Sequence, residues 1–438
     1  MIFSRSYLPK SHSTWSLVFI VFFFGLNLSC DDIFNTKSNQ DTDEIFDEGN
    51  IDPRLENVDG YAPVLPFWGG FDAPNDVHVG FDEFVYVTDA NGVHLLDRAD
   101  LSPRVSIDLE GAEAVTQDRL LNVYVAARID TIIESIDPTI TWNLPAVFKI
   151  KNMNGAGPIT FVDTLIFPFD DASLSTSAAQ NARLNRGSSV NYEKVRITGL
   201  SILADNTLYV TRTGPFNETT QVAAPDNTVL EFHRVVIDGQ KTDKMRNVRQ
   251  IRSLSPNVPS LRSAIGLSSI ASFVAPPQRD TYTDDRSFLI TQADASKEIP
   301  FRVLWINVVE TVDGLVYQQN SQLLAQDTTQ ADGFLYETNK FLSPQDVAFG
   351  GDDDAFIFVV DSETHRLYQF QSNGQEGVPP PAGAADQTRQ ILVSFGELGA
   401  GPKEFNQPSG VAYFRRVVYV ADKGNNRIAR FKLTSDFE

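Results

Sequence analysis

FGELGAGPKEFNQPSGVAYFRRVVYVADKGNNRIARF, residues 395–431, is the stretch from which the fold can be worked out. After a glycine-rich opening, two short apolar runs follow one another, Gly410–Phe414 and Val417–Ala421. The polar turn Asp422–Asn426 then leads to a third run that begins at Arg427. Apolar runs of about five residues separated by tight polar turns predict an antiparallel meander of β-strands.

This stretch resembles an NHL repeat, a motif that ends in V-Y-V-A-D-x-x-N-x-R-I. The matching positions are Pro408, Gly410, Tyr419, Val420, Asp422, Asn425, Asn426, Arg427 and Ile428. An NHL repeat is one blade of a β-propeller, and a single blade cannot bury both of its faces alone. The resemblance therefore implies an all-β fold, an NHL or TolB-like β-propeller, with further blades along the chain.

The middle strand of the repeat recurs at irregular intervals. Its signature is a short apolar run of the type Tyr-Val-x-Asp, and we find it six times. The predicted middle strands are Phe84–Asp89, Asn122–Ala126, Thr207–Thr211, Ser287–Thr291, Ala355–Asp361 and Val417–Ala421. Their shortness, their β-branched residues and the turns beside them favour strands over buried helix.

Each middle strand has a predicted inner strand before it and a return strand after it. The inner strands are Asn75–Val79, Ala112–Thr116, Ile197–Leu203, Ile265–Phe273, Ser343–Ala348 and Gly410–Phe414. The return strands are Gly92–Leu96, Ala146–Ile150, Thr228–Phe232, Phe301–Val308, Arg366–Phe370 and Arg427–Leu433. Blade two has a predicted fourth strand, Thr160–Phe167, and the segments Ile129–Asn143 and Gly214–Asn227 are interpreted as polar insertions.

The last blade lacks an outer strand of its own. The apolar segment Ala62–Trp68 precedes a glycine pair much as Ile391–Phe395 precedes Gly396 in the last repeat. A strand from the N-terminal side in that place would complete the sixth blade and leave no open edge. We therefore predict six blades in one domain, residues 61–438, closed by this strand.

A seventh blade is the competing count. It would have to lie in one of the long segments Asp170–Tyr192 or Asp238–Ser260. Their many Ser, Asn, Gln, Asp and Arg residues favour loops, so six blades is the prediction.

The composition is that of a folded, acidic protein. The 438 residues include 57 acidic and 36 basic side chains, which gives a formal net charge of −21. Such a field repels phosphate backbones, so we expect no nucleic acid partner. Hydrophobic residues at 42% and aromatic residues at 11% are enough for a large core and argue against global disorder.

Residues 1–30 are typical of an export signal. Arg5 and Lys10 precede the apolar run Trp15–Leu26, which is too short for a comfortable membrane-spanning helix. The run leads into Leu-Asn-Leu-Ser-Cys at residues 26–30, which resembles a bacterial lipobox, although Asn27 departs from that pattern. The resemblance implies that Cys30, the chain's single cysteine, carries a lipid; an uncleaved anchor or a plain signal peptide is the alternative.

The segment Asp31–Gly60 is polar and strongly acidic. It shows no apolar period, so we interpret it as a flexible tether between the lipid and the folded domain. The expected location is the cell envelope, with the protein anchored to a bacterial membrane and facing either the periplasm or the outside.

Propeller loops that enter the inner strands share one face with the turns after the middle strands. That face would collect the polar residues Asn75, Asp76, Asp89, Asn91, Arg128, Arg212, Gln345, Asp346, Asp361, Glu363, Asp422, Asn425 and Arg427. Convergent charges at a channel mouth can hold a polar ligand or a cation. In repeats of this kind Asp422, Asn425 and Arg427 mostly brace the turn and the neighbouring blade, and we expect bracing from them.

The sequence offers little that points to catalysis. Outside the signal it has four histidines, His78, His94, His233 and His365, and none is spaced as a metal pair. His78 is placed to line the channel, although a structural role is the simpler interpretation. The run at residues 352–354, three aspartates, lacks the rest of a calcium loop and fits a polar hairpin turn.

Three functions remain open on the sequence, of which a carbohydrate-handling accessory protein is hinted at only by scattered aromatic residues, such as Trp142 and Tyr192 in the insertions. The first is a lipid-anchored, monomeric binding or scaffold protein whose loop face engages an envelope or extracellular protein, a peptide or a glycan, without a cofactor. The second is a hydrolase or lyase of the lactonase type, which would use a divalent cation such as calcium in the central channel. Fold alone does not separate them, because propellers host both binding and catalysis.

Overall fold

The structure is a computed structural model, and it describes residues 60–99, 102–174, 176–217, 225–251, 265–276, 285–294, 298–353, 355–380 and 389–434. All of them belong to the unit Glu48–Glu438. The expected signal, Cys30 and the tether up to residue 59 lie outside the described residues. Within the described part, no helix is long and apolar enough to span a membrane.

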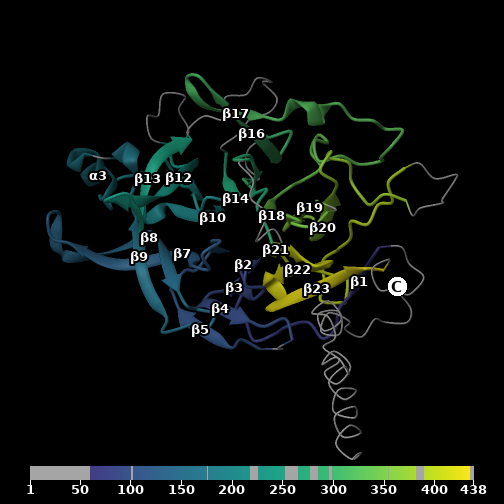
Figure 1. The fold of residues 1–438 in the computed structure, drawn as a ribbon, viewed down its shortest axis with the longest axis horizontal. Helices are drawn as coiled ribbons and strands as arrows, with labels where there is room; N and C mark the ends of the chain where they lie inside the picture. The colour runs from purple at the N-terminus through teal and green to yellow at the C-terminus, as the bar shows by residue number, and fades with distance from the viewer. Residues whose placement is uncertain are drawn as a thin grey trace, which may run out of the picture. The chain divides into compact units, whose positions relative to one another are not determined.

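Six small antiparallel sheets stand in a ring around a central axis, which makes the fold a six-bladed β-propeller (Figure 1). Blade one contains β2 (Asp76–Val79), β3 (Val85–Thr88), β4 (Gly92–Leu96) and β5 (Val105–Asp108). Blade two contains β6 (Ala114–Gln117), β7 (Val123–Ile133), β8 (Asp137–Lys151) and β9 (Thr160–Ile166). Blade three contains β10 (Arg196–Ile202), β11 (Leu208–Thr213), β12 (Thr228–Ile237) and β13 (Gln240–Ile251).

The second half of the ring repeats this order. Blade four contains β14 (Leu267–Ser272), β15 (Phe288–Gln292), β16 (Val303–Thr311) and β17 (Gly314–Gln319). Blade five contains β18 (Pro344–Phe349), β19 (Ile357–Asp361) and β20 (Arg366–Phe370). Blade six contains β21 (Pro408–Phe414), β22 (Val417–Asp422) and β23 (Arg427–Leu433). The six-bladed prediction is confirmed.

Helical turns occupy a few of the connections. Between blades two and three lie the 3₁₀ turn η3 (Ala172–Leu174), the helix α3 (Ser177–Arg183) and the 3₁₀ turn η4 (Tyr192–Lys194). Two further 3₁₀ turns are η5 (Ser321–Leu324), after β17, and η6 (Lys423–Asn425), between β22 and β23.

The ring is closed by a strand from the N-terminal side, as the sequence predicts. Strand β1 (Tyr61–Pro63) pairs antiparallel with β23, with Tyr61 opposite Leu433. Further along, Trp68 forms an isolated bridge with Ile428 and is fully buried. The closing strand is shorter than the predicted segment 62–68, and it hydrogen-bonds the last blade to the beginning of the described chain.

The middle strands explain why the sequence pattern was readable. Every residue of β3, β15, β19 and β22 is buried, because each of these strands is sandwiched between its neighbours in the sheet and the adjacent blades. A strand buried on both faces is apolar throughout, which produces the short continuous runs from which the blades were counted.

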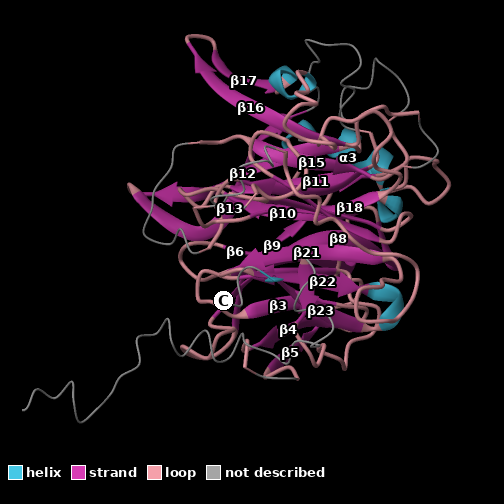
Figure 2. Ribbon diagram, turned by 90° about the vertical axis from the view of Figure 1, so that its right-hand side faces the viewer, coloured by secondary structure: helices cyan, strands magenta, loops and turns pink. Residues whose placement is uncertain are grey.

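Two predicted loops are strands, and these predictions were wrong. The segment 129–143, interpreted as a polar insertion, is the outer part of one long hairpin in which β7 pairs with β8. Part of the segment 238–260 is β13, the outer strand of blade three rather than a loop. Most of β13 faces solvent, so few of its positions are apolar. In the segment 129–143, by contrast, Ile133 and Trp142 are buried in the core that blades two and three share. Figure 2 shows the β12–β13 and β16–β17 hairpins extending beyond the sheets they belong to.

Candidate functional site at the channel mouth

The innermost strand of each blade lines a central channel. Side chains from all six of these strands (β2, β6, β10, β14, β18 and β21) surround one cavity of about 100 Å³. A wider pocket of about 360 Å³ lies where the six strands begin. We call this end of the channel the mouth.

The residue at the mouth is polar in every blade. The pairing of each inner strand with its middle strand identifies equivalent positions around the ring. The first equivalent residues, which we call the mouth ring, are Asn75, Glu113, Thr198, Ser268, Gln345 and Ser409. The pocket is therefore lined by a polar side chain from every blade, although the inner strands consist largely of apolar residues.

Four members of the mouth ring also tie neighbouring blades together. Each donates a hydrogen bond to a backbone carbonyl of the next blade, that of the residue just before the mouth-ring residue there. The pairs are Asn75 with Ala112 at 2.7 Å, Thr198 with Leu267 at 2.9 Å, Ser268 with Pro344 at 2.7 Å and Ser409 with Pro74 at 2.7 Å. The last pair crosses from the sixth blade to the first, so it reinforces the closure of the ring.

Charged side chains stand among these polar residues. The Arg196 guanidinium donates to both carboxylate oxygens of Glu113 at 2.8 Å, a bidentate pair between blades two and three. The Lys423 ammonium, from η6 in blade six, donates to Oδ1 of Asn75 at 2.8 Å. Burial lowers the pKa of Lys423, the charge of Arg196 lowers it further, and the charge of Glu113 opposes that shift. Asp294 completes the charged rim on the side of blade four.

One layer deeper, two carboxylates face the channel. Asp76 accepts hydrogen bonds from the backbone N–H of Val77 at 2.7 Å and of Val115, in the next blade, at 2.9 Å. Asp346 repeats this arrangement in blade five. It accepts from Val347 at 2.8 Å and from Val411 at 2.7 Å, and also from the Ser269 hydroxyl.

The space between these two carboxylates belongs to a glycine. Gly410 occupies the equivalent position in blade six, and a Cβ there would lie 2.7 Å from the Cα of Asp76. No side chain fits where adjacent inner strands approach so closely, which gives a physical reason for the glycine of the repeat motif. Asp76 and Asp346, on the two sides of blade six, lie near enough for their charges to interact.

The surroundings of these carboxylates shift their titration. Burial raises the pKa of Asp76 well above its usual range, and the charge of Asp346 raises it further against the pull of two backbone hydrogen bonds. Burial also raises the pKa of Asp346, to about 6, although the Ser269 hydroxyl and two backbone N–H groups act in the opposite direction. Perturbed carboxyl groups of this kind in a cleft mark a candidate functional site.

The channel becomes apolar toward its other end. His78 lies two residues after Asp76 on β2, lines the channel and accepts a hydrogen bond from the Gln117 N–H at 3.3 Å. Burial lowers the pKa of His78 to about 4, so this imidazole is neutral at physiological pH. Beyond it, Phe81, Ala204 and Val274 form a small buried apolar cluster after the inner strands end.

Three of the predicted site residues brace turns instead of facing the pocket. Asp89, Asp361 and Asp422 are fully buried at the ends of three middle strands. Asp361, for example, accepts from the N–H groups of Leu342 and Ser343, in the loop before the inner strand, and of Glu363 in the next turn. Each carboxylate therefore joins the loop before its inner strand to the turn after its middle strand.

The predicted arginines serve as clamps. Arg427 donates to Asp422 at 2.7 Å and to the backbone carbonyls of residues 400, 401 and 404, as the bracing interpretation expects. Arg128 donates to the carbonyls of Asn143 and Glu193, which joins the blade-two hairpin to the segment before blade three. Arg212 is fully buried beside Asp171 and Tyr192.

Of the thirteen polar residues predicted for the binding face, the structure thus brings Asn75, Asp76, Gln345 and Asp346 to the channel. Asp89, Arg128, Arg212, Asp361, Asp422 and Arg427 lie in the blade bodies and turns. Other residues of the mouth were not predicted from the sequence: Glu113, Arg196, Thr198, Ser268, Asp294, Ser409 and Lys423. A signal for the ring residues existed, because an alignment of the six inner strands would place a polar residue at the same position in every blade.

No metal centre emerges from the residues whose positions are described. Among them, no three His, Cys, Asp or Glu side chains gather closely enough to hold an ion. Asp352, at the start of the aspartate run, lies in the turn between β18 and β19 and accepts a hydrogen bond from the Tyr413 hydroxyl at 2.6 Å. His94 and His233 contact Asp89 and Glu231 at 2.9 and 2.7 Å.

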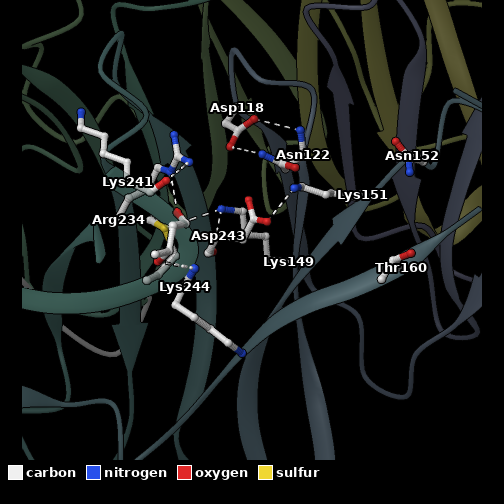
Figure 3. Close-up of polar contacts among 12 residues, drawn as sticks. Asp118, Asn122, Lys149, Lys151, Asn152, Thr160, Arg234, Lys241, Asp243 and Lys244 are labelled. Atoms are coloured by element: carbon white, nitrogen blue, oxygen red, sulfur yellow. Dashed lines mark hydrogen bonds and ion pairs between the residues drawn. The ribbon is translucent and has the colours of Figure 1, made fainter. Parts of the chain in front are cut away.

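A second concentration of charge lies between blades two and three (Figure 3). Asp243 accepts from Lys151 at 2.6 Å, while its backbone carbonyl accepts from the buried Lys149 ammonium at 2.9 Å. The side chains of Lys241 and Lys244 point away from each other and from this contact in Figure 3. The group joins two blades and does not converge on a common point, so the mouth is the better candidate.

The ring of blades and the mouth define the class: the chain is a six-bladed β-propeller that carries an NHL repeat. Residues 405–431 match the family model of the NHL repeat, as the sequence resemblance implied. No curated protein sequence matches the chain.

Solved propellers are similar to this chain at low identity. An auxiliary nutrient binding protein from Bacteroides thetaiotaomicron is 13% identical over 87% of this chain and 74% of its own, with a TM-score of 0.43. A virginiamycin B lyase from Staphylococcus aureus is 11% identical over 84% and 98%, with a TM-score of 0.37. A gluconolactonase from Xanthomonas campestris is 9% identical over 85% and 89%, with a TM-score of 0.43. At these values the likenesses do not distinguish binding from catalysis.

Proposed function

We propose that this chain is a ligand-binding propeller of the cell envelope, which takes a polar ligand, a peptide or glycan segment of its partner, at the channel mouth. The observation that carries the proposal is the mouth itself. All six blades contribute a polar side chain to one pocket of about 360 Å³, and charged groups stand at its rim. Polar groups that converge on a pocket fix the orientation of a bound ligand and give the site its specificity.

The geometry favours binding over the lactonase-type alternative. Each channel carboxylate already accepts two or more hydrogen bonds from the protein, which fixes its orientation. The hydroxyl groups of Thr198, Ser268 and Ser409 donate to backbone carbonyls rather than to a base. A nucleophile needs a base within hydrogen-bond reach, and these contacts do not provide one.

A blocked mouth tests the proposal. Ala293 lines the pocket, and Ala293→Trp would fill it with an indole ring. Ala156→Trp, on an exposed turn of blade two, is the matched control. We expect the full-length protein in detergent to bind members of a mixed glycan and peptide array, the control to bind the same members, and Ala293→Trp to lose them. Equal binding by all three proteins would contradict the mouth as the site.

We further propose that Cys30 carries the lipid that holds the protein at a bacterial membrane. The lipobox-like run 26–30 and the single cysteine support this. Metabolic labelling with an alkyne-bearing fatty acid should mark the wild-type protein and leave Cys30→Ala unlabelled. Labelling of both proteins, or of neither, would contradict the anchor.

A further inference from the structure

We propose that the mouth selects a ligand that carries a carboxylate beside hydrogen-bond donors, the chemistry of a uronic-acid sugar, and that Lys423 pairs with the carboxylate. This inference rests on the proposed function, since it names the ligand class of the same pocket. It starts from the one ammonium group at the rim that has no carboxylate partner among the described residues.

The position of Lys423 leaves it available. Its side chain is half-buried, and its one hydrogen bond within the described structure goes to the neutral amide oxygen of Asn75, at 2.8 Å. An ammonium group has three hydrogens to donate, so two remain after this contact. Asn75 in turn is held by its own hydrogen bond to the carbonyl of Ala112. The ammonium is therefore oriented at the rim without being neutralised.

The other charges at the rim are balanced within the protein. Arg196 and Glu113 neutralise each other through their bidentate pair. Asp294 lies near enough to Arg302 for the two charges to attract, and Arg302 also donates to its backbone carbonyl at 2.9 Å. Arg302 also faces the buried Asp361, so the pocket lining itself holds two basic groups, Arg196 and Lys423, and two acidic groups, Glu113 and Asp294. Of the two basic groups, Lys423 is the one with no carboxylate at ion-pair distance among the described residues.

The ammonium of Lys423 belongs to a molecule whose formal net charge is −21. Long-range attraction toward the protein is therefore not available to an anion, and salt would screen it in any case. A short-range pair inside a partly buried pocket is screened much less. The carboxylate of a ligand would therefore be attracted only once it lies beside Lys423. A ligand without a carboxylate would lack this ion pair, so the pocket would select for the carboxylate.

The mouth ring supplies the second half of the recognition. The hydroxyl hydrogens of Thr198, Ser268 and Ser409 are committed to backbone carbonyls of the next blade. Their oxygens therefore keep lone pairs to accept with, although Thr198 and Ser268 also share hydrogen bonds with the hydroxyls of Thr211 at 3.2 Å and Thr291 at 2.7 Å. A matching ligand must donate hydrogen bonds to these oxygens while it presents a carboxylate to Lys423. Sugar hydroxyls next to a carboxylate meet both requirements.

Titration with matched probes tests the inference. Trigalacturonic acid carries the carboxylates, and its full methyl ester lacks their charge while keeping the hydroxyls. Trialanine with a free C-terminus and its C-terminal amide provide a second pair, in which the carboxylate comes from a peptide. We expect isothermal titration of the full-length protein to show binding of the acidic sugar at least about tenfold tighter than of its ester.

Variants assign the effect to Lys423. Lys423→Met should lose about tenfold in affinity for trigalacturonic acid and leave the ester unchanged, while Lys423→Arg should retain most of the preference. Lys241→Met, on the exposed outer hairpin, removes a lysine far from the pocket and should change nothing. Thermal unfolding of each variant checks that the fold is intact.

The contrary outcomes are distinct. Equal binding of acid and ester, or an unchanged Lys423→Met, would overturn this inference, while loss of that binding in Ala293→Trp would leave the proposed function standing. Discrimination confined to the peptide pair would overturn the sugar assignment. If none of these probes and no member of the wider array binds the wild type, both the inference and the proposed function are wrong.

Discussion

The carboxyl group of Asp346 is subject to two opposing effects on its pKa, burial and hydrogen bonding. Its burial in the channel wall disfavours the charged form, while three donors hold its oxygens in place. The balance leaves its pKa at about 6, compared with an ordinary value of 3.8. Between those two pH values the folded protein binds more protons than the unfolded chain does. The stability that this group contributes is therefore present below pH 3.8 and lost as the pH rises through 6.

This balance predicts a pH dependence that Asp346→Asn removes. As the pH rises from 3.5 to 7, the free energy of unfolding of the wild type should fall relative to the variant, by about 3 kcal/mol at 1.36 kcal/mol per pKa unit. Asp76 acts in the same direction, because burial, and after it the charge of Asp346, raises its pKa. Urea unfolding at a series of pH values measures the difference. A difference that stays constant over this range would show that the carboxyl group is not perturbed.

Arg212 shows how a residue predicted to face a ligand can belong to the core. Its guanidinium donates to Asp171, to the Tyr192 hydroxyl at 2.7 Å and to the carbonyls of residues 225 and 226. From the sequence alone it is a charged residue after a middle strand, equivalent to Asp89 or Asp422. Nothing in the local pattern indicates that the segment before blade three folds over it.

Arg212→Ala should therefore be strongly destabilising. The variant removes the guanidinium that pairs with the buried Asp171, a loss of about 3–5 kcal/mol of unfolding free energy. Arg389→Ala removes an exposed arginine paired with Asp332 and should cost at most about 1 kcal/mol. Urea denaturation of both variants measures the contrast. Similar small losses in the two proteins would mean that Arg212 is not held as described.

At the scale of elements, the closing strand is the connection on which the ring depends. The short β1 and the bridge at Trp68 join a segment near residue 61 to the last blade. Trp68 packs on the ring of Tyr419, with centroids 5.6 Å apart, and under the guanidinium of Arg430. This closure was predictable, because the apolar segment before the first blade has the composition of the strand that the last blade lacks.

Removing this anchor should weaken the whole ring. Trp68→Ala deletes a fully buried indole and should cost about 3–5 kcal/mol. Val312→Ala, on a fully exposed hairpin tip, should leave stability unchanged. Amide hydrogen exchange would show whether β23 loses protection in Trp68→Ala, as expected for a strand whose partner is loosened. Unaltered protection of β23 would argue that closure does not depend on this residue.

The elements that the sequence did not predict lie in the outer parts of blades two and three. The outer part of the β7–β8 hairpin buries only some of its side chains, such as Ile133 and Trp142, and in β13 only Met245, Asn247 and Ile251 are buried. An outer strand with so few buried positions has little need of apolar alternation, so its pattern is that of a loop. The inner and middle strands were predictable for the opposite reason, since burial on both sides forces them to be apolar.

At the scale of the whole molecule, the ring converts six similar strands into one site. Each blade places one polar residue at the mouth, so residues far apart in the chain, from Asn75 to Lys423, surround a single pocket. Four of the polar residues expected on this face, Asn75, Asp76, Gln345 and Asp346, line the channel. The predicted residues beside the middle strands brace turns and blades instead. The spacing along one blade does not reveal which side chains of six blades converge.

The measurement that tests this account most directly is hydrogen exchange of the full-length protein with and without a ligand selected from the array. The account predicts that the ligand slows exchange at the mouth, in the first residues of the inner strands and around Lys423. It also predicts that the outer hairpins β7–β8, β12–β13 and β16–β17 keep their rates. Protection confined to those hairpins or to the charged group between blades two and three, with an unchanged mouth, would contradict it.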